Sequence, residues 1–291
     1  MNHTRRTARF ISRSGSALLG AVLLLVAARG QATDPLVDAM SREHAGDSPV
    51  ASEAARGAVA KPVEERAVVY GDIDGRELRG FLARPDAAAS APGILVIHEW
   101  WGLNDNIRAM ARQLAAAGYA ALAVDLYGGE SAVDARGARA LMSAARAEPR
   151  SMLENLRQAH EYLKRELGAS RTGSIGWCFG GGLSLEAALM LGPDLDAAVM
   201  YYGSVVTDEA RLRTLRAPVL GLFGSADRGI PVESVRAFEK ALGTLGKEAR
   251  ILVYEGADHA FANPSGTRYQ AEAAEDAWRR TLEFFQKTLE P

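Results

Sequence analysis

Residues 173–185 read GSIGWCFGGGLSL and contain Cys178, the only cysteine of the chain. The apolar residues before Cys178 are typical of a buried strand, and the residues after it are typical of a helix. Gly176 and Gly180 flank the cysteine in a G-x-C-x-G pattern, which indicates a sharp strand-to-helix turn that carries a nucleophile. Such a turn leaves no room for side chains at the flanking positions. A helix that begins directly after Cys178 would direct backbone N–H groups at the sulfur and favour a thiolate.

Segments typical of strands and of helices alternate on both sides of this turn. We expect strands at residues 93–99, 120–129, 173–178, 197–203, 219–227 and 251–256. We expect helices at residues 106–117, 135–147, 151–167, 179–191, 232–245 and 274–289. Short, continuous apolar runs between helices indicate strands that are buried on both faces of a mainly parallel sheet. The Asp74-Gly75 turn within Ala67–Pro85 predicts an antiparallel hairpin in front of that sheet.

The order of these elements and the turn at Cys178 predict an α/β protein with the α/β-hydrolase fold. We expect a mainly parallel central sheet with helices on both faces and no cap domain. In this fold the acid and the histidine follow the nucleophile along the chain. Asp227 and His259 meet that requirement, because each comes directly after a predicted strand. Asp258 is a rival acid, but its position next to His259 makes a well-oriented bond to that ring awkward.

The other histidines fit the role of His259 less well. They are His3 near the N-terminus, His44 before the first strand, His98 after an earlier strand and His160 on a predicted polar helix face. The predicted catalytic triad is therefore Cys178, Asp227 and His259.

The N-terminus has the three parts of a secretory signal peptide: basic residues, the apolar run Ala17–Ala28 and the small-residue site Gly30-Gln31-Ala32. The apolar run is too short for a helix that spans a ~30 Å hydrocarbon core, although an uncleaved anchor is the alternative. We therefore expect residues 1–32 to be a cleaved signal peptide and the mature protein to be exported, to the periplasm or beyond. Residues 33–60 then form a strap or linker with room for a short helix at Leu36–Met40, and residues 61–291 form the catalytic domain.

Charge and cysteine content restrict the classes of partner. The formal net charge is −2, and loss of the five arginines in residues 1–32 makes it −7, so no nucleic-acid partner is expected. A single cysteine also excludes an intrachain disulfide framework. We expect a small-molecule substrate, no cofactor, no metal and no stable membrane insertion after processing.

Several motifs taken together resemble the dienelactone hydrolase family. They are His98-Glu99-Trp100-Trp101-Gly102, Asp125-Leu126-Tyr127-Gly128-Gly129, Gly176-Trp177-Cys178-Phe179-Gly180-Gly181, Tyr201-Tyr202-Gly203 and Gly256-Ala257-Asp258-His259-Ala260-Phe261. The resemblance covers about residues 65–290. It implies a single-domain enzyme that cleaves dienelactones or related esters without a metal or cofactor.

The resemblance also implies roles for further residues. Glu99 would contact the nucleophile and help to deprotonate it when substrate binds, and the N–H groups of Trp100 and Phe179 would form the oxyanion hole. Tyr202 would contact the substrate. Asn263 stands where well-studied members carry an arginine that binds the substrate carboxylate, which puts recognition of an anionic substrate in doubt. A second substrate arginine would be Arg136 or Arg139, and Arg139 is preferred.

The sequence thus predicts hydrolysis of a carboxylic ester or lactone through a thioester on Cys178. One alternative is an esterase or thioesterase that acts on a compound other than dienelactone. Another is a ligand-binding relative without activity, although a complete triad argues against it. A redox role for Cys178 lacks a second cysteine to resolve a disulfide.

Overall fold

The computed structural model describes Met1 and residues 35–44, 46, 47, 49, 59, 61–86 and 90–290. The predicted signal peptide beyond Met1, and half of the predicted strap, lie outside the described residues. Residues Thr33–Pro291 form one compact unit. Among the described residues, no helix has the length and apolar character needed to cross a bilayer.

Eight strands form one sheet. They are β1 (Val63–Ile73), β2 (Arg76–Pro85), β3 (Gly93–Ile97), β4 (Ala120–Val124), β5 (Thr172–Trp177), β6 (Ala197–Tyr201), β7 (Val219–Gly224) and β8 (Ala249–Tyr254). Their spatial order is β1-β2-β4-β3-β5-β6-β7-β8. The hairpin β1–β2 turns at Asp74-Gly75 and pairs antiparallel with β4, whereas all pairs from β4 to β8 are parallel. The carboxyl ends of β3 to β8 therefore meet at one edge of the sheet.

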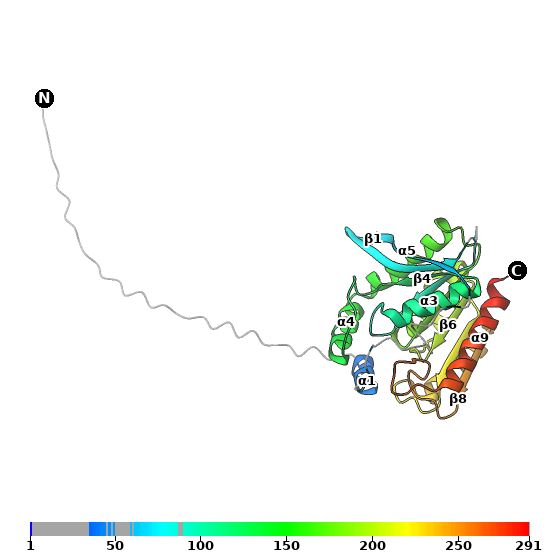
Figure 1. The fold of residues 1–291 in the computed structure, drawn as a ribbon. Coiled ribbons are helices and arrows are strands. Elements are labelled where there is room, and N and C mark those ends of the chain that lie inside the picture. The colour runs from blue at the N-terminus through cyan, green and yellow to red at the C-terminus, as the bar shows by residue number, and fades with distance from the viewer. Residues whose placement is uncertain are drawn as a thin grey trace. The chain divides into compact units, whose positions relative to one another are not determined.

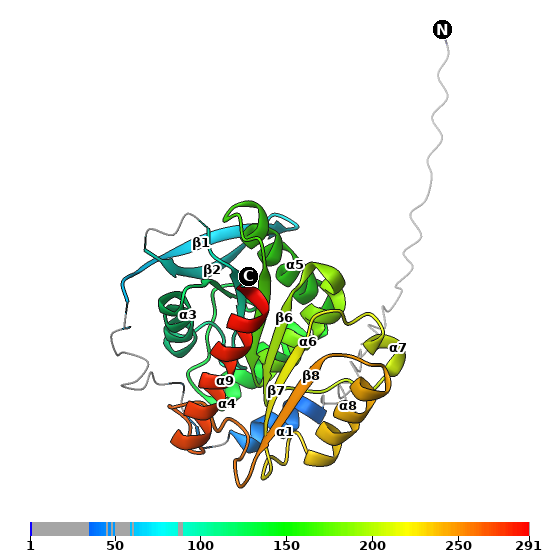
Figure 2. The ribbon, with the colours of Figure 1, turned by 90° about the vertical axis from the view of Figure 1, so that its right-hand side faces the viewer.

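Helices cover both faces of the sheet. The elements are α1 (Pro35–Glu43), α3 (Asp105–Ala117), α4 (Ala135–Ala147), α5 (Pro149–Arg165), α6 (Phe179–Leu191), η1 (Gly192–Asp194), α7 (Glu209–Leu212), α8 (Val232–Thr244) and α9 (Ala271–Leu289). Helices α3 and α9 pack on one face, and α5 and α6 pack on the other (Figures 1 and 2). Helix α1 packs against α4, beside the edge of the sheet where the strands end (Figure 1). This architecture confirms the predicted α/β-hydrolase fold.

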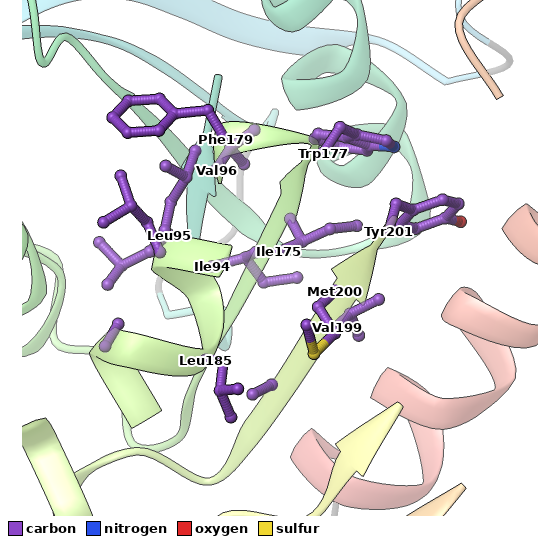
Figure 3. Packing of buried hydrophobic residues seen from close by; sticks show 14 of the residues in the cluster. Ile94, Leu95, Val96, Ile175, Trp177, Phe179, Leu185, Val199, Met200 and Tyr201 are labelled. Atoms are coloured by element: carbon purple, nitrogen blue, oxygen red, sulfur yellow. The ribbon is translucent and has the colours of Figure 1, made fainter. Parts of the chain in front are cut away.

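The central strands are buried on both faces, as their continuous apolar sequences predict. Every residue of β3, β5 and β6 is buried. Figure 3 shows residues of these strands packed with Leu185 of α6, and Trp177 beside Tyr201 at the strand ends. The core thus holds the ends of β5 and β6 rigidly where the chain turns at Cys178.

The structure corrects the placement of His160. The sequence pattern predicts that it lies on a polar helix face, but its side chain is buried on α5. Its Nε2 lies 2.9 Å from Thr172 Oγ1 and 3.1 Å from the Asp194 carbonyl oxygen. The periodicity of α5 could not predict a buried imidazole, because the groups that bind His160 lie on other elements, β5 and η1.

Candidate active site

Cys178 joins β5 to α6 in a strained conformation, with φ 55° and ψ −117°. A Cβ at Gly176 would lie 2.1 Å from the Gly180 carbonyl oxygen, and a Cβ at Gly180 would lie 2.3 Å from the Ile97 carbonyl oxygen. Both distances are far below van der Waals contact, so the turn requires the two glycines that the sequence analysis singled out. The cysteine is only 2% exposed at the start of α6.

Asp227 and His259 meet after β7 and β8. His259 Nδ1 donates a hydrogen bond to Asp227 Oδ2 at 2.8 Å, and both side chains are buried. The other carboxylate oxygen of Asp227 accepts from the N–H groups of Gly229 and Ile230, each at 2.8 Å. Asp258 is engaged by the backbone instead, because its Oδ1 accepts from the His259 N–H at 2.6 Å. The geometry therefore pairs the imidazole with Asp227 rather than with Asp258.

The sulfur lies beside the second nitrogen of this ring. Cys178 Sγ and one ring nitrogen each of His259 and His44 lie within 4.8 Å of one another. Burial raises the pKa of Cys178, but the neighbouring imidazoles of His259 and His44 outweigh it and bring this pKa down to about 6. Burial lowers the pKa of His259, whereas the thiolate and Asp227 raise it to about 10. Each group thus favours the charged form of the other, a thiolate on Cys178 and an imidazolium on His259.

The loop after β3 lies opposite the turn at Cys178. The Tyr127 hydroxyl donates to the Trp100 carbonyl oxygen at 3.2 Å, and His98 Nε2 accepts from the Leu126 N–H at 3.2 Å. These bonds tie the loop to the end of β4. Phe179 is the first residue of α6, and its ring stacks on Tyr127. The two residues predicted to supply oxyanion amides thus belong to segments that are joined through Tyr127.

Glu99 is buried close to the sulfur. Its Oε2 accepts from Asn263 Nδ2 at 2.8 Å, and its Oε1 has no hydrogen-bond partner. Burial and the Cys178 thiolate raise the pKa of Glu99 to about 7. The raised pKa favours the neutral carboxyl form of Glu99 beside the Cys178 thiolate.

The predicted substrate-binding residues are placed differently. Tyr202 is fully buried, has a φ of 37° and has a hydroxyl without a hydrogen-bond partner. Asn263 holds Glu99. Arg139 forms an ion pair with Asp38 of α1, and Arg136 is exposed. The role of each in binding substrate stays a prediction.

Sequence reasoning missed two residues of this site, Met40 and His44. Met40 Sδ lies 3.3 Å from Cys178 Sγ, and the His44 ring lies 5.5 Å from the His259 ring, centroid to centroid. One feature of the sequence could have pointed to them: Met40 and His44 are four residues apart, so both lie on one face of a helix. That signal predicts a shared face but does not say what the face contacts.

Two cavities border this group of residues. One, of about 10 Å³, is lined by Met40, Met142, Cys178, Phe179, Tyr202, Ser204, Ile230 and His259. The other, of about 50 Å³, is lined by Glu99, Asn106, Ile107, Ala109, Met110, Gln113, Trp177, Tyr202, Ala262, Asn263 and Pro264. The cavity at the sulfur has about the volume needed for a single water molecule, and the flexible Met40 and Met142 side chains belong to its lining.

The site contains an unusual group of buried polar atoms without hydrogen-bond partners. They are His44 Nε2, His259 Nε2, Glu99 Oε1, Tyr202 Oη and Trp100 Nε1. Buried polar groups are normally paired, so this grouping indicates a site whose partners come from a bound molecule.

Known proteins share this architecture. The sequence profile of the dienelactone hydrolase family matches residues 78–289. A Saccharolobus solfataricus protein described as "Putative carboxymethylenebutenolidase" is 31% identical over 260 residues, which cover 77% of this chain and 98% of that protein. A Salmonella typhimurium protein of the same description is 35% identical over 225 residues, covering 72% of this chain and 83% of the relative.

A solved structure agrees with these matches. The crystal structure described as a "Putative Dienelactone Hydrolase" from Klebsiella pneumoniae superposes with a TM-score of 0.71 and 30% identity, covering 78% of this chain and 100% of that one. The chain therefore belongs to the dienelactone hydrolase family of α/β-hydrolases. The matched region begins at Leu78, so α1 and His44 lie outside it.

Proposed function

We propose that this protein hydrolyses a small carboxylic ester or lactone, with Cys178 as nucleophile, His259 as acid and base, and Asp227 as the group that orients His259. The single observation that carries this proposal is the Asp227–His259 bond of 2.8 Å beside a buried cysteine on a strained strand-to-helix turn. Membership of a hydrolase family supports it. The ring nitrogen of His259 that Asp227 does not bind lies beside the sulfur, where it can exchange a proton with Cys178.

The first half of the reaction forms a thioester. The Cys178 thiolate attacks the carbonyl carbon, and the N–H groups of Trp100 and Phe179 stabilise the resulting oxyanion. The tetrahedral intermediate collapses as the carbon–oxygen bond of the ester breaks. His259 gives its Nε2 proton to the departing alkoxide, so an alcohol leaves and a neutral imidazole remains.

The second half of the reaction returns the free enzyme. His259 Nε2 takes a proton from water while the water oxygen attacks the thioester carbonyl. The second tetrahedral intermediate collapses, the carbon–sulfur bond breaks, and the Cys178 thiolate faces an imidazolium again. Carboxylic acid is released, and for a lactone the acid and the alcohol remain in one molecule.

The experiment that tests this proposal is a burst assay with p-nitrophenyl acetate. We expect a burst of about one equivalent of p-nitrophenol per active chain, followed by slower turnover. Prior alkylation by iodoacetamide should abolish both phases, and mass spectrometry of quenched enzyme should find an acetyl group on Cys178. Undiminished hydrolysis by alkylated enzyme would overturn the assignment of the nucleophile.

We further propose that the substrate is neutral around its reacting centre. Neither of the two cavities at the site is lined by a lysine or an arginine, and Glu99 would repel an anion once it is ionised. An apolar ester should therefore compete well with a matched carboxylate-bearing lactone. A preference of a hundredfold in kcat/KM for the charged compound, ~2.7 kcal/mol, would contradict this proposal.

Export is the remaining part of the proposed function. The basic, apolar and small-residue segments of residues 1–32 support a cleaved signal peptide. On this proposal the mature enzyme acts outside the cytoplasm, in the periplasm or beyond. Identification of the first residue of the exported protein tests it.

A further inference from the structure

A second histidine–aspartate pair borders the nucleophile. His44 follows α1, and its Nδ1 lies 2.7 Å from Asp47 Oδ2. The His44 side chain is fully buried, its Nε2 has no hydrogen-bond partner, and the ring lies close enough to Cys178 to share a ligand with it. The pair therefore presents its free ring nitrogen to the sulfur, as the Asp227–His259 pair does.

Asp47 is itself firmly held. Its Oδ1 accepts from the Thr267 N–H at 3.0 Å and from the Thr267 hydroxyl at 2.6 Å, and Arg268 Nη2 lies 3.2 Å from its Oδ2. Burial raises the pKa of Asp47, but the bonds from His44 and Thr267 lower it well below its usual range. The ionised Asp47 carboxylate beside Nδ1 orients the His44 ring and stabilises its protonated form. Carboxylates that bind one ring nitrogen have the same effect on other functional histidines.

The charged groups around His44 act in both directions. Burial and His259 oppose a proton on the ring, whereas Asp47 and the Cys178 thiolate favour it, and the net effect is a raised pKa. The Arg268 guanidinium lies 3.1 Å from His44 Nδ1 and also opposes protonation, but it shares the Asp47 carboxylate that neutralises it. Glu99, on the loop after β3, adds negative charge when it is ionised.

Aromatic packing is the simpler explanation for a buried His44. Its ring lies 4.9 Å from Trp100 and 5.9 Å from Trp101, measured between centroids. A phenylalanine would provide the same contacts without the cost of burying a polar ring. Packing explains neither the paired carboxylate on Nδ1 nor the free Nε2 beside the sulfur.

We propose that His44 is a second catalytic imidazole, which keeps its proton through the cycle and stabilises the Cys178 thiolate whenever His259 is neutral. The proposal rests on the proposed thioester chemistry. It matters most in the second half-reaction, when His259 must accept a proton from water while the sulfur leaves as an anion. Because the His44 proton is neither donated nor replaced, the balance of atoms and charges in the two half-reactions is unchanged.

The test measures the thiol directly, without turnover. The rate of iodoacetamide alkylation of Cys178 is followed against pH in the full-length protein and in His44→Gln and Asp47→Asn variants. We expect the midpoint of the wild-type profile near pH 6, a rise of about one pH unit in His44→Gln and a smaller rise in Asp47→Asn. The midpoint reports the pKa of the thiol. Movement of α1 would expose the sulfur and lower this pKa, whereas loss of the His44 charge raises it, so the direction of the shift separates the two effects.

Kinetics provide the second readout. His44→Gln should lower kcat by about tenfold to a hundredfold with less effect on KM, because the charge acts on the transition state. Arg42→Gln changes an exposed residue of α1 and is the matched control, which should leave the alkylation midpoint and kcat unchanged.

The outcomes separate the two proposals. An unchanged midpoint and an unchanged kcat in His44→Gln would overturn the role of His44 while the burst assay still supports Cys178. An absent burst in wild-type enzyme would overturn the thioester proposal, and with it the catalytic role of His44, even if the midpoint shifts. If His44→Gln fails to fold, Asp47→Asn alone decides, because a wild-type midpoint and kcat in that variant would contradict the proposal.

Discussion

Cys178 adopts a backbone conformation that few non-glycine residues adopt. Its φ of 55° costs about 1–3 kcal/mol, a cost that the buried packing around β5 and α6 must offset. In return the side chain faces two imidazoles and the carboxyl group of Glu99 at once. The site is thus arranged around one sulfur, whose imidazole neighbours lower its pKa and favour the thiolate.

The triad prediction belongs at this scale. Cys178→Ala should abolish turnover of p-nitrophenyl acetate and leave the circular dichroism spectrum unchanged. Asp227→Asn should lower kcat by up to ~10⁴, because the amide favours the wrong imidazole tautomer. Asp258→Asn is the matched control, since that carboxylate accepts from the backbone and not from the ring. A harmless Asp227→Asn beside a damaging Asp258→Asn would show that the acid had been misidentified.

Glu99→Gln tests the influence of a carboxyl group beside the thiolate. The amide side chain of this variant can still accept a hydrogen bond from Asn263, but it cannot ionise. Because Glu99 has a pKa of about 7, above that of the thiol, the variant should keep the alkylation midpoint near pH 6 and lose only the repulsion that ionised Glu99 exerts on the thiolate at higher pH. Alkylation at neutral pH should be no slower than in wild type, whereas ester turnover should fall. Slower alkylation of the variant would contradict this account, and the exposed Glu130→Gln should change neither rate.

At the scale of elements, the site depends on how closely α6 approaches the end of β3. Gly180 permits that approach, because its missing Cβ would lie 2.3 Å from the Ile97 carbonyl oxygen and 2.5 Å from the His98 carbonyl oxygen. Helix α1 adds a second approach from the other side, where Met40 contacts the sulfur. The ion pair between Asp38 and Arg139 links α1 to α4.

Gly180→Ala should therefore destabilise the protein strongly. The new Cβ must displace backbone rather than a flexible side chain, so we expect the free energy of unfolding to fall by about 3 kcal/mol or more. Gly182→Ala is the control on the same helix, where the nearest atom outside the helix lies 3.3 Å from the added Cβ. Urea unfolding of both variants measures the difference, and equal midpoints would show that α6 does not need the close approach.

At the scale of the whole molecule, the segment before β1 belongs to the catalytic unit. The compact unit begins at Thr33, the residue that follows the predicted cleavage site, and α1 begins two residues later. Cleavage there would leave Met40 and His44 in the mature protein. The segment that the sequence suggests is a strap thus carries side chains of the active site.

Export can be tested on the protein recovered from a culture. We expect intact-mass analysis of the exported protein to identify Thr33 as its first residue, because Gly30-Gln31-Ala32 has the small-residue spacing of a cleavage site. Replacement of Ala32 by a bulky residue should cause the precursor to accumulate. Recovery of a chain that begins at Met1 from the membrane fraction would instead support an uncleaved anchor.

The sequence by itself determined the alternating strands and helices, the glycine-flanked turn at Cys178 and the order of Asp227 and His259. Each of these is encoded locally, by apolar periodicity or by turn chemistry, and becomes a site because parallel strands end at a common edge. Only the tertiary structure decided that α1 covers that edge, that His44 borders the sulfur, and that Arg139 pairs with Asp38. These contacts join residues far apart in the chain, so no local pattern could reveal them.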